Sequence, residues 1–431
     1  MRKSFLLVLL ASIMLVGCGT EKKDAPKDEP VSEKKEVPTE TQSKEQDIQE
    51  EVSFDSTELS DSNFVNSIKV ADMIAKTDES SNIMFSPTSL NFALGIVSDG
   101  AKGETSELLA SYLGAYSYGN KAKNYLDNLS KFNSDDTLNG YKTKLEIADA
   151  LWVSDKVNLK EDYKGNDESE YSATVETVNF DNKEETCSII NKWVDTKTNS
   201  MIKEIISPKL IKPETVMCIT NSVYFESAWA EAWKYHDYDV EEFTKSNGDK
   251  LDCCYMYTDG DGYYENDYAT AFASNYVNGI KFIGILPKEE GKFNLEDLDI
   301  KGLLETKSYD YDELHVKMPK LNFETSANLN PMLKALGMGL LFEDDSDFTG
   351  IAEGVDLKVG SIIQKTNLEL DENGTRAAAV TSIFMDLDSC VMQEDNPVIK
   401  EVYLDRPFAF LIYDEENDEV LFMGKVVTLD N

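Results

Sequence analysis

The segment from Ser361 to Leu387 constrains the fold more than any other part of the chain. Residues 361–370 alternate between apolar and polar side chains, as expected for a half-buried strand. After the polar turn Asp371–Gly374, every second residue from Thr375 onward is again small or apolar and uncharged. Because successive side chains of a strand point to opposite faces, the pattern predicts two successive strands, each with one buried face.

The second of these runs allows two interpretations. Its uncharged face consists of Thr375, Ala377, Ala379, Thr381, Ile383, Met385 and Leu387. The opposite face consists of Arg376, Ala378, Val380, Ser382, Phe384, Asp386 and Asp388. The run is either an ordinary sheet strand or a segment that is exposed first and enters a sheet later. An exposed apolar strand is a liability, so the second interpretation requires a function that retains it.

The first eighteen residues resemble an export signal with a bacterial lipobox. Arg2 and Lys3 precede an apolar run, Phe5–Val16, that is too short to span a bilayer. The run ends in Leu15–Cys18, so we expect a lipoprotein signal peptide over residues 1–17 and lipidation of Cys18. The alternative is an ordinary secretory signal. Both interpretations place the mature chain outside the cytoplasm, and the first anchors it at the cell surface.

Residues 18–53 are predicted to be a disordered acidic tether behind the lipidated cysteine. The stretch Glu21–Glu50 is rich in charge and proline and has almost nothing to bury. Folded periodicity starts near Phe54, so we expect one domain over residues 54–431. Its helical patterns come mainly first and its strand patterns last, which is typical of an α+β fold.

The expected elements follow from hydrophobic periodicity. The expected helices are Ser62–Lys76, Pro87–Ser98, Glu185–Thr198 and Leu329–Leu336. The expected strands are Leu145–Val153, Val216–Phe225, Leu314–Leu321, Ser361–Leu370, Phe408–Tyr413 and Val420–Val427.

Charge limits the classes of partner. The 431 residues include 42 Lys and Arg against 81 Asp and Glu, a formal net charge of −39. Such a chain repels nucleic acid phosphates and anionic membrane surfaces, so we expect no nucleic acid partner and membrane contact only through the lipid. There are only two histidines, His236 and His315, which makes a histidine-rich metal site impossible.

No motif for catalysis, a metal or a cofactor stands out. The cysteines after Cys18 lack the C-x-x-C spacing of a zinc site, and Cys187 and Cys218 fall in apolar patterns typical of a core. Acidic residues between Asp345 and Asp356 partly match a calcium loop, but an acidic surface turn is the favoured interpretation. We therefore expect neither a metal nor a cofactor.

A set of motifs in order from about residue 62 to 427 resembles the serpin family. These motifs are Asn82–Ser89, Gly100–Thr105, Ala148–Trp152, Ile190–Val194, Thr220–Phe225 with Trp229, Met318–Leu321, Asp347–Ile351, Gln364–Thr366, Asp371–Ala379, Arg406–Phe408 and Leu421–Val426. Each is weak alone, but together they are specific.

The resemblance implies three β-sheets, about nine helices and an exposed reactive loop. A target protease would cleave this loop, which then inserts as a new strand into the central sheet and drags the acylated protease with it. The chain would thus be a protease inhibitor used once, not an enzyme, and a monomer. The target would be a serine protease, with the cysteine class as the second candidate. A noninhibitory serpin that acts as a binding or chaperone-like module is one alternative. A lipid-anchored solute-binding protein is the other, but its two-lobed α/β pattern is not found.

The resemblance also implies site residues. The loop hinge would contain Glu372, Gly374, Thr375, Ala377, Ala378 and Ala379. The residues that control opening of the central sheet would be Ser86, Ser89, Asn221, Trp229, Lys320 and Gln364. Lys320 and Glu372 are expected to form an ion pair. Two positions depart from the family pattern, since Arg376 stands where a Glu is usual and Gln364 where many animal relatives have His.

The reactive bond is placed by counting. The family's span of seventeen residues, counted from Glu372, ends at Asp388, so cleavage is expected between Asp388 and Ser389. The loop is longer than usual after this point, which leaves Leu387, Val391 and Met392 as alternative cleavage positions. An Asp before the bond suits a protease with a basic specificity pocket.

Overall fold

The computed structural model describes residues 62–129, 132–138, 141–212, 214–354, 357–375 and 397–429. All of them belong to one compact unit, Asp47–Asn431. Cys18, the predicted tether, Ala377–Ala379 and the Asp388–Ser389 bond lie outside the described residues. In the described part, no helix is both long and apolar enough to cross a membrane.

The described residues form eight α-helices, mostly in the first half of the chain. They are α1 (Asn63–Thr77), α2 (Pro87–Gly100), α3 (Gly103–Leu113), α4 (Gly119–Leu129), α5 (Glu161–Glu170), α6 (Lys183–Lys197), α7 (Ile300–Leu304) and α8 (Asn330–Leu333). Helix α2 begins as its sequence predicts: the Ser86 hydroxyl caps it by accepting a hydrogen bond from the Ser89 amide, and Pro87 occupies the first turn.

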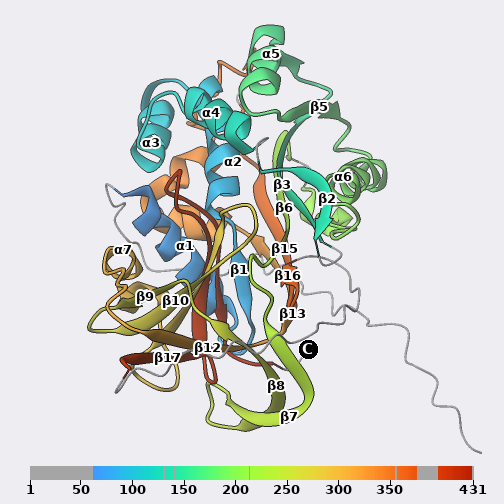
Figure 1. The fold of residues 1–431 in the computed structure, drawn as a ribbon. Helices are drawn as coiled ribbons and strands as arrows, with labels where there is room; N and C mark the ends of the chain where they lie inside the picture. Colours follow the sequence, from blue (N-terminus) through green and yellow to red (C-terminus); the bar gives the residue numbers. More distant parts are fainter. Residues whose placement is uncertain are drawn as a thin grey trace, which may run out of the picture. The chain divides into compact units, whose positions relative to one another are not determined.

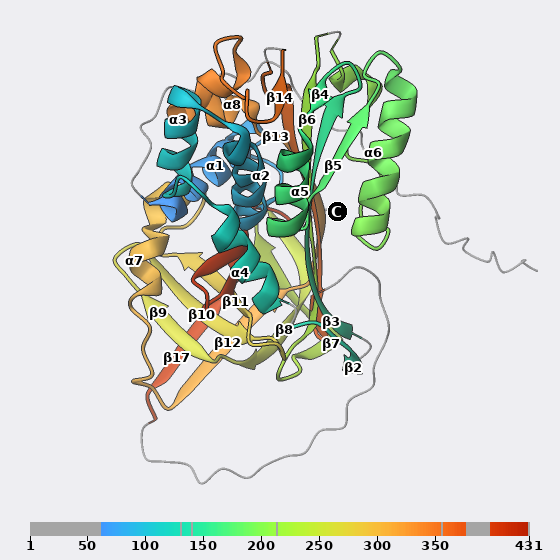
Figure 2. The same cartoon turned by 90° about the horizontal axis from the view of Figure 1, so that it is seen from above.

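Seven strands make a large sheet, which we call the central sheet (Figure 1). Its order is β13 (Leu321–Asn328), β15 (Ser361–Asp371), β16 (Gly374–Thr375), β6 (Met217–Ala228), β3 (Tyr141–Ser154) and β2 (Ser134–Leu138), and β5 (Thr174–Val178) also pairs with β3. Strand β6 is buried along its whole length because the sheet is covered on both faces. Figure 2 shows α6 on one side of this sheet and α1 and α2 on the other.

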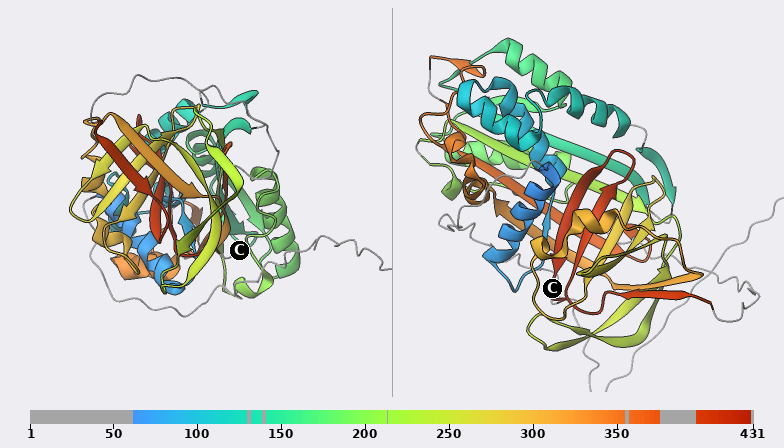
Figure 3. Two further views of the ribbon diagram at one scale, coloured as in Figure 1. Left: turned by 60° about the horizontal axis from the view of Figure 1, so that its bottom comes forward. Right: turned by 90° about the vertical axis from the view of Figure 1, so that its left-hand side faces the viewer.

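Two further sheets and one short strand pair complete the fold. The six-stranded sheet has the order β1 (Ile83–Phe85), β19 (Glu419–Val426), β18 (Phe408–Asp414), β11 (Lys281–Pro287), β10 (Ala269–Asn275) and β9 (Gly262–Glu265). The four-stranded sheet has the order β17 (Ile399–Tyr403), β12 (Glu313–Pro319), β8 (Lys250–Asp259) and β7 (Lys234–Thr244). The pair is β14 (Ala352–Glu353) with β4 (Asn158–Leu159). The four-stranded sheet lies at the opposite end from α3 and α5 (Figures 1 and 3).

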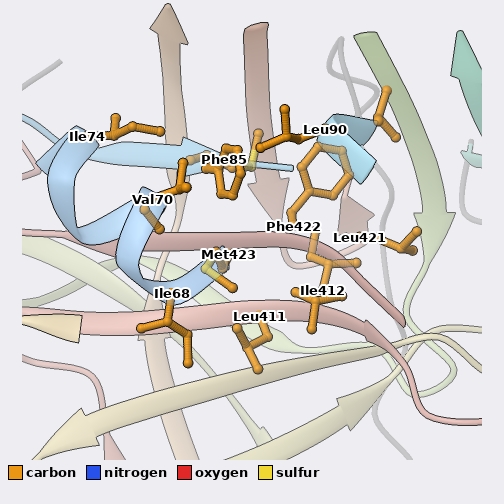
Figure 4. Packing of buried hydrophobic residues seen from close by; sticks show 14 of the residues in the cluster. Ile68, Val70, Ile74, Phe85, Leu90, Leu411, Ile412, Leu421, Phe422 and Met423 are labelled. Carbon is orange, nitrogen blue, oxygen red and sulfur yellow. The ribbon is translucent and has the colours of Figure 1, made fainter. Parts of the chain in front are cut away.

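The core has two parts, one on each face of the central sheet. The larger part joins α1 and α2 to the six-stranded sheet, and Figure 4 shows Ile68, Phe85 and Met423 within it. The smaller part lies under α6, where Cys187 and Ile190 pack with Trp152 of β3. Cys187 and Cys218 are both buried here as free thiols, as their apolar surroundings predicted.

The predicted elements are mostly present, with two corrections. The expected strand Leu314–Leu321 is in fact two strands, because β12 ends at Pro319 and β13 starts at Leu321 in a different sheet. A proline cannot donate a ladder hydrogen bond, which is consistent with an end at this point. The expected short helix Leu329–Leu336 is α-helical only over α8, and the chain continues from Lys334 as a π-helix in which Gly337 departs from helical geometry.

Candidate functional site

The candidate site lies where β15 and β6 end beside the four-stranded sheet, an end we call the head of the central sheet. From Asp371 the chain turns and returns as β16, which lies between β15 and β6. Thr375 stands opposite Leu370 on one side and Ser227 on the other. The described residues pair β15 directly with β6 only over 361–364 and 218–221. The hinge therefore already separates the two strands at the head of the sheet.

Gly374 is the residue that fits this position. A Cβ atom there would lie 2.2 Å from the carbonyl oxygen of Ser227, a backbone atom that cannot move aside. The Asp371 carboxylate fixes the preceding turn, since its Oδ1 accepts hydrogen bonds from the amides of Asn373 (2.8 Å) and Gly374 (3.3 Å). The Asp371–Gly374 motif is thus needed for close backbone approach and for turn formation.

Two tryptophans hold the turn from the side of β7. The Trp229 indole donates to the Asp371 carbonyl at 2.8 Å, and its backbone amide donates to the Asn373 carbonyl at 3.0 Å. The Trp233 amide donates to the Glu372 carbonyl at 3.2 Å. The three carbonyls of the turn are therefore all bonded to the chain that leads from β6 into β7.

Lys320 and Glu372 form the expected ion pair. Lys320 Nζ lies 2.6 Å from Glu372 Oε2, and the side chains are 37% and 21% exposed. The approach falls outside hydrogen-bond geometry, so the contact is an electrostatic one. The ammonium also lies 3.5 Å from the ring centroid of Tyr235, a cation–π contact that sequence reasoning missed.

Thr375 faces the core, as the alternation predicted. Its side chain is 3% exposed, and its Oγ1 lies 2.5 Å from the hydroxyl of Tyr276. Tyr276 follows β10 in the six-stranded sheet, and its ring stacks on Trp229 with centroids 4.3 Å apart. The sequence motifs gave no signal for Tyr276, because only the packing of two sheets brings it to the hinge.

Gln364 joins the paired parts of β15 and β6. Its Nε2 donates to Asn221 Oδ1 at 2.9 Å and to the Ser86 carbonyl at 3.0 Å. Its Oε1 accepts from the Ser86 amide at 2.7 Å. Gln364 thus makes the contacts expected of it, and Ser86 and Asn221 meet at one point. Ser89 is fully buried beside them and contributes its amide to the Ser86 cap.

Asp149 is a buried acid at this point that the sequence analysis did not single out. It stands opposite Asn221 on β3 and is 1% exposed. Burial raises the pKa of its carboxyl well above the ordinary value. Burial therefore favours the protonated, neutral form of the Asp149 carboxyl in this cluster.

The comparisons with known proteins agree with this geometry. The family model Serpin (serine protease inhibitor) matches residues 62–429. The chain is a serpin. Serpins are in general protease inhibitors, as the description of the family model states.

Relatives of this serpin occur in archaea and animals. An uncharacterized serpin-like protein of Thermococcus kodakarensis is 31% identical over 99% of both chains. Human neuroserpin is 27% identical over 84% of this chain and 89% of its own. The crystal structure of the thermophilic serpin tengpin in the native state matches with a TM-score of 0.72 and 28% identity, over 87% of this chain and 98% of that chain.

Proposed function

We propose that this serpin is a single-use protease inhibitor whose loop inserts between β15 and β6 after cleavage. The observation that carries the proposal is the position of β16, which begins an antiparallel strand in that place. An inserted strand would gain ladder hydrogen bonds on both sides and bury one apolar face. The direct β15–β6 pairing that must give way is only four residues long in the described part.

The register of β16 supports the assignment of the loop faces. Continued along the sheet, it would place Ala377 between Phe225 and Leu368, and Ala379 between Val223 and Thr366. All four of these neighbours are buried, so small side chains are required there. Ala377 and Ala379 are suited to this environment.

The same register supports a role for Gln364 in controlling how the central sheet opens between β15 and β6. Thr381 would arrive between Asn221 and Gln364, whose 2.9 Å hydrogen bond now spans β6 and β15. Insertion must break that bond, and the Thr381 hydroxyl can replace it for either partner. The bond would hold the sheet closed below the hinge until the loop is cut.

The length of β6 supports cleavage after Asp388. Strand β6 begins at Met217, which stands opposite Met385 in the continued register. A strand cut after Asp388 could therefore pair along the whole of β6 and keep a short segment to hold the acylated protease. We propose Asp388–Ser389 as the reactive bond and a serine protease with a basic specificity pocket as the target.

We further propose that the inhibitor acts at the cell surface. The support is the lipobox-like Leu15–Cys18 and the acidic stretch Glu21–Glu50, which would hold the domain away from the membrane. The inhibitor would then meet proteases outside the cytoplasm, as a monomer and without a cofactor.

The test is incubation with a panel of serine and cysteine proteases, followed by a denaturing gel. We expect a covalent complex with a protease that cuts after acidic residues. Asp388→Arg should transfer complex formation to a trypsin-like protease, whereas Asp386→Arg should yield only cut protein with that protease. Cut protein without any covalent complex, across the panel, would contradict trapping and favour the noninhibitory alternative.

A further inference from the structure

The hydroxyl of Tyr276 is fixed in a fully buried place beside the hinge. Its ring is held between Trp229, stacked at 4.3 Å, and Phe225, whose ring centroid lies 5.0 Å away edge-on. The Tyr276 amide donates to the Ile280 carbonyl at 2.9 Å, which fixes the backbone as well. The side chain therefore cannot turn its hydroxyl toward solvent.

Thr375 Oγ1 is the hydrogen-bond partner that the described residues offer to this hydroxyl, at 2.5 Å. Both side chains are buried, with exposed fractions of 1% for Tyr276 and 3% for Thr375. A buried hydroxyl that loses its partner costs more free energy than the bond itself contributes. Withdrawal of Thr375 from the sheet would therefore leave Tyr276 with an unmet hydrogen bond.

We propose that Tyr276 is a positioning residue that holds Thr375 inserted in the uncleaved chain. Tyr276 follows a strand of the six-stranded sheet, and its hydroxyl contacts the first inserted side chain. The contact therefore favours a residue with a hydroxyl at position 375. It acts together with the backbone pairs of Gly374 and Thr375 to Ala228 and Ser227.

The consequence for inhibition rests on the proposed function. Separating β15 from β6 at the head of the sheet is the first step of insertion, and here it precedes cleavage. After cleavage, the strand would extend from pairs that already exist. A chain without the Tyr276 contact would begin insertion more slowly, and more of it would be released as cut protein.

The test is hydrogen–deuterium exchange on the full, uncleaved chain. The segment that contains Gly374 and Thr375 should be protected in the wild type. Tyr276→Phe and Thr375→Val should each speed the exchange of this segment about tenfold. Each change removes the hydrogen bond and leaves the remaining buried hydroxyl without a partner. The double variant should exchange less rapidly than the product of the two effects predicts.

Tyr163→Phe is the matched control, since it removes another buried hydroxyl, one that donates to the Ile96 carbonyl at 2.8 Å. It should leave exchange at the hinge unchanged. Free exchange of the segment in the wild type, or equal exchange in wild type and Tyr276→Phe, would overturn the proposal. Because no protease is present, the result stands apart from whether the chain traps a protease.

Discussion

Lys320 and Glu372 form an ion pair, with Nζ 2.6 Å from Oε2, at the point where the hinge enters the central sheet. Lys320 is the single residue between β12 and β13, and Glu372 is the first residue after β15. The pair thus joins the turn before the hinge to the junction of two sheets. Partial shielding should make it worth more than an exposed pair, which contributes about 0–1 kcal/mol.

Lys320→Glu should loosen the turn that holds the hinge at the head of the sheet and should favour loop insertion between molecules. Two like charges would then meet where an ion pair was, and the cation–π contact with Tyr235 would be lost as well. The readout is polymer formation on a native gel after mild heating.

The control for Lys320→Glu is Lys301→Glu, an exposed position in α7. Lys317, although nearer in sequence, is unsuitable, because it is 8% exposed and paired with Glu241 at 2.7 Å. If both variants polymerise equally, only net charge matters and Lys320 has no gating role.

Thr375→Arg should convert the inhibitor into a substrate. The change places a charge on the core face of the inserting strand, at a cost on the order of several kcal/mol. Ala378→Arg is the comparison for the opposite face of the strand, where Arg376 already places a positive charge. The Thr375 variant should still be cut at a similar rate but leave no covalent complex. A complex formed with unchanged stoichiometry would show that the buried face is wrongly assigned.

Arg376, where relatives usually have Glu, should stabilise the inserted strand. Arg376 itself lies outside the described residues, but the register of β16 would place it opposite Glu226 and Glu369. Arg376→Glu would bring three carboxylates together and remove charge-assisted contacts, a loss of about 2 kcal/mol. The melting temperature of the cleaved form should fall, with a smaller loss for Arg376→Gln. Equal melting temperatures of the three cleaved proteins would refute the placement.

The sequence revealed the periodic features of this site but not the contacts made across sheets. Alternation showed that Thr375 faces the core, and the polar turn showed where Gly374 must lie. Tyr276 and Asp149 could not be predicted, because their importance depends on which strands become neighbours in three dimensions. Lys317 shows the same limit: a lysine in a strand normally indicates an exposed position, yet here rings of Tyr255 and Tyr403 cover it at 4.5 and 5.1 Å.

Two acids near α5, the buried Asp167 and the half-buried Asp99, should make stability depend on pH. Burial raises the pKa of Asp99 to about 6 and that of Asp167 to about 8, and nearby Glu170 adds to both shifts. An unfolded aspartate titrates near 3.9, so between these values the native state holds protons that the unfolded state has lost. The contribution of each protonated carboxyl to the free energy of unfolding is fully present below about pH 4. It is lost as the pH rises through about 6 for Asp99 and about 8 for Asp167.

Asp167→Asn should flatten the fall in stability between pH 5 and pH 8. Removal of one such carboxyl makes the fall of the free energy of unfolding with pH less steep by roughly 1.4 kcal/mol per pH unit. The measurement is the free energy of unfolding by denaturant at several pH values. Asp181→Asn is the control, since Asp181 is exposed and pairs with Lys156 at the surface. Parallel curves for wild type and Asp167→Asn would exclude a protonated Asp167 in the native state.

The most direct test of loop insertion is the melting temperature of the chain before and after a single cut. Cleavage between Ile383 and Val391 should release the loop to form a strand between β15 and β6, which adds ladder hydrogen bonds and apolar burial. The cut site is confirmed by mass spectrometry, and thermal unfolding is then followed by circular dichroism. We predict a sharp rise in the melting temperature of the cut protein. An unchanged or lower value after a confirmed single cut would contradict insertion and place this serpin in the noninhibitory class.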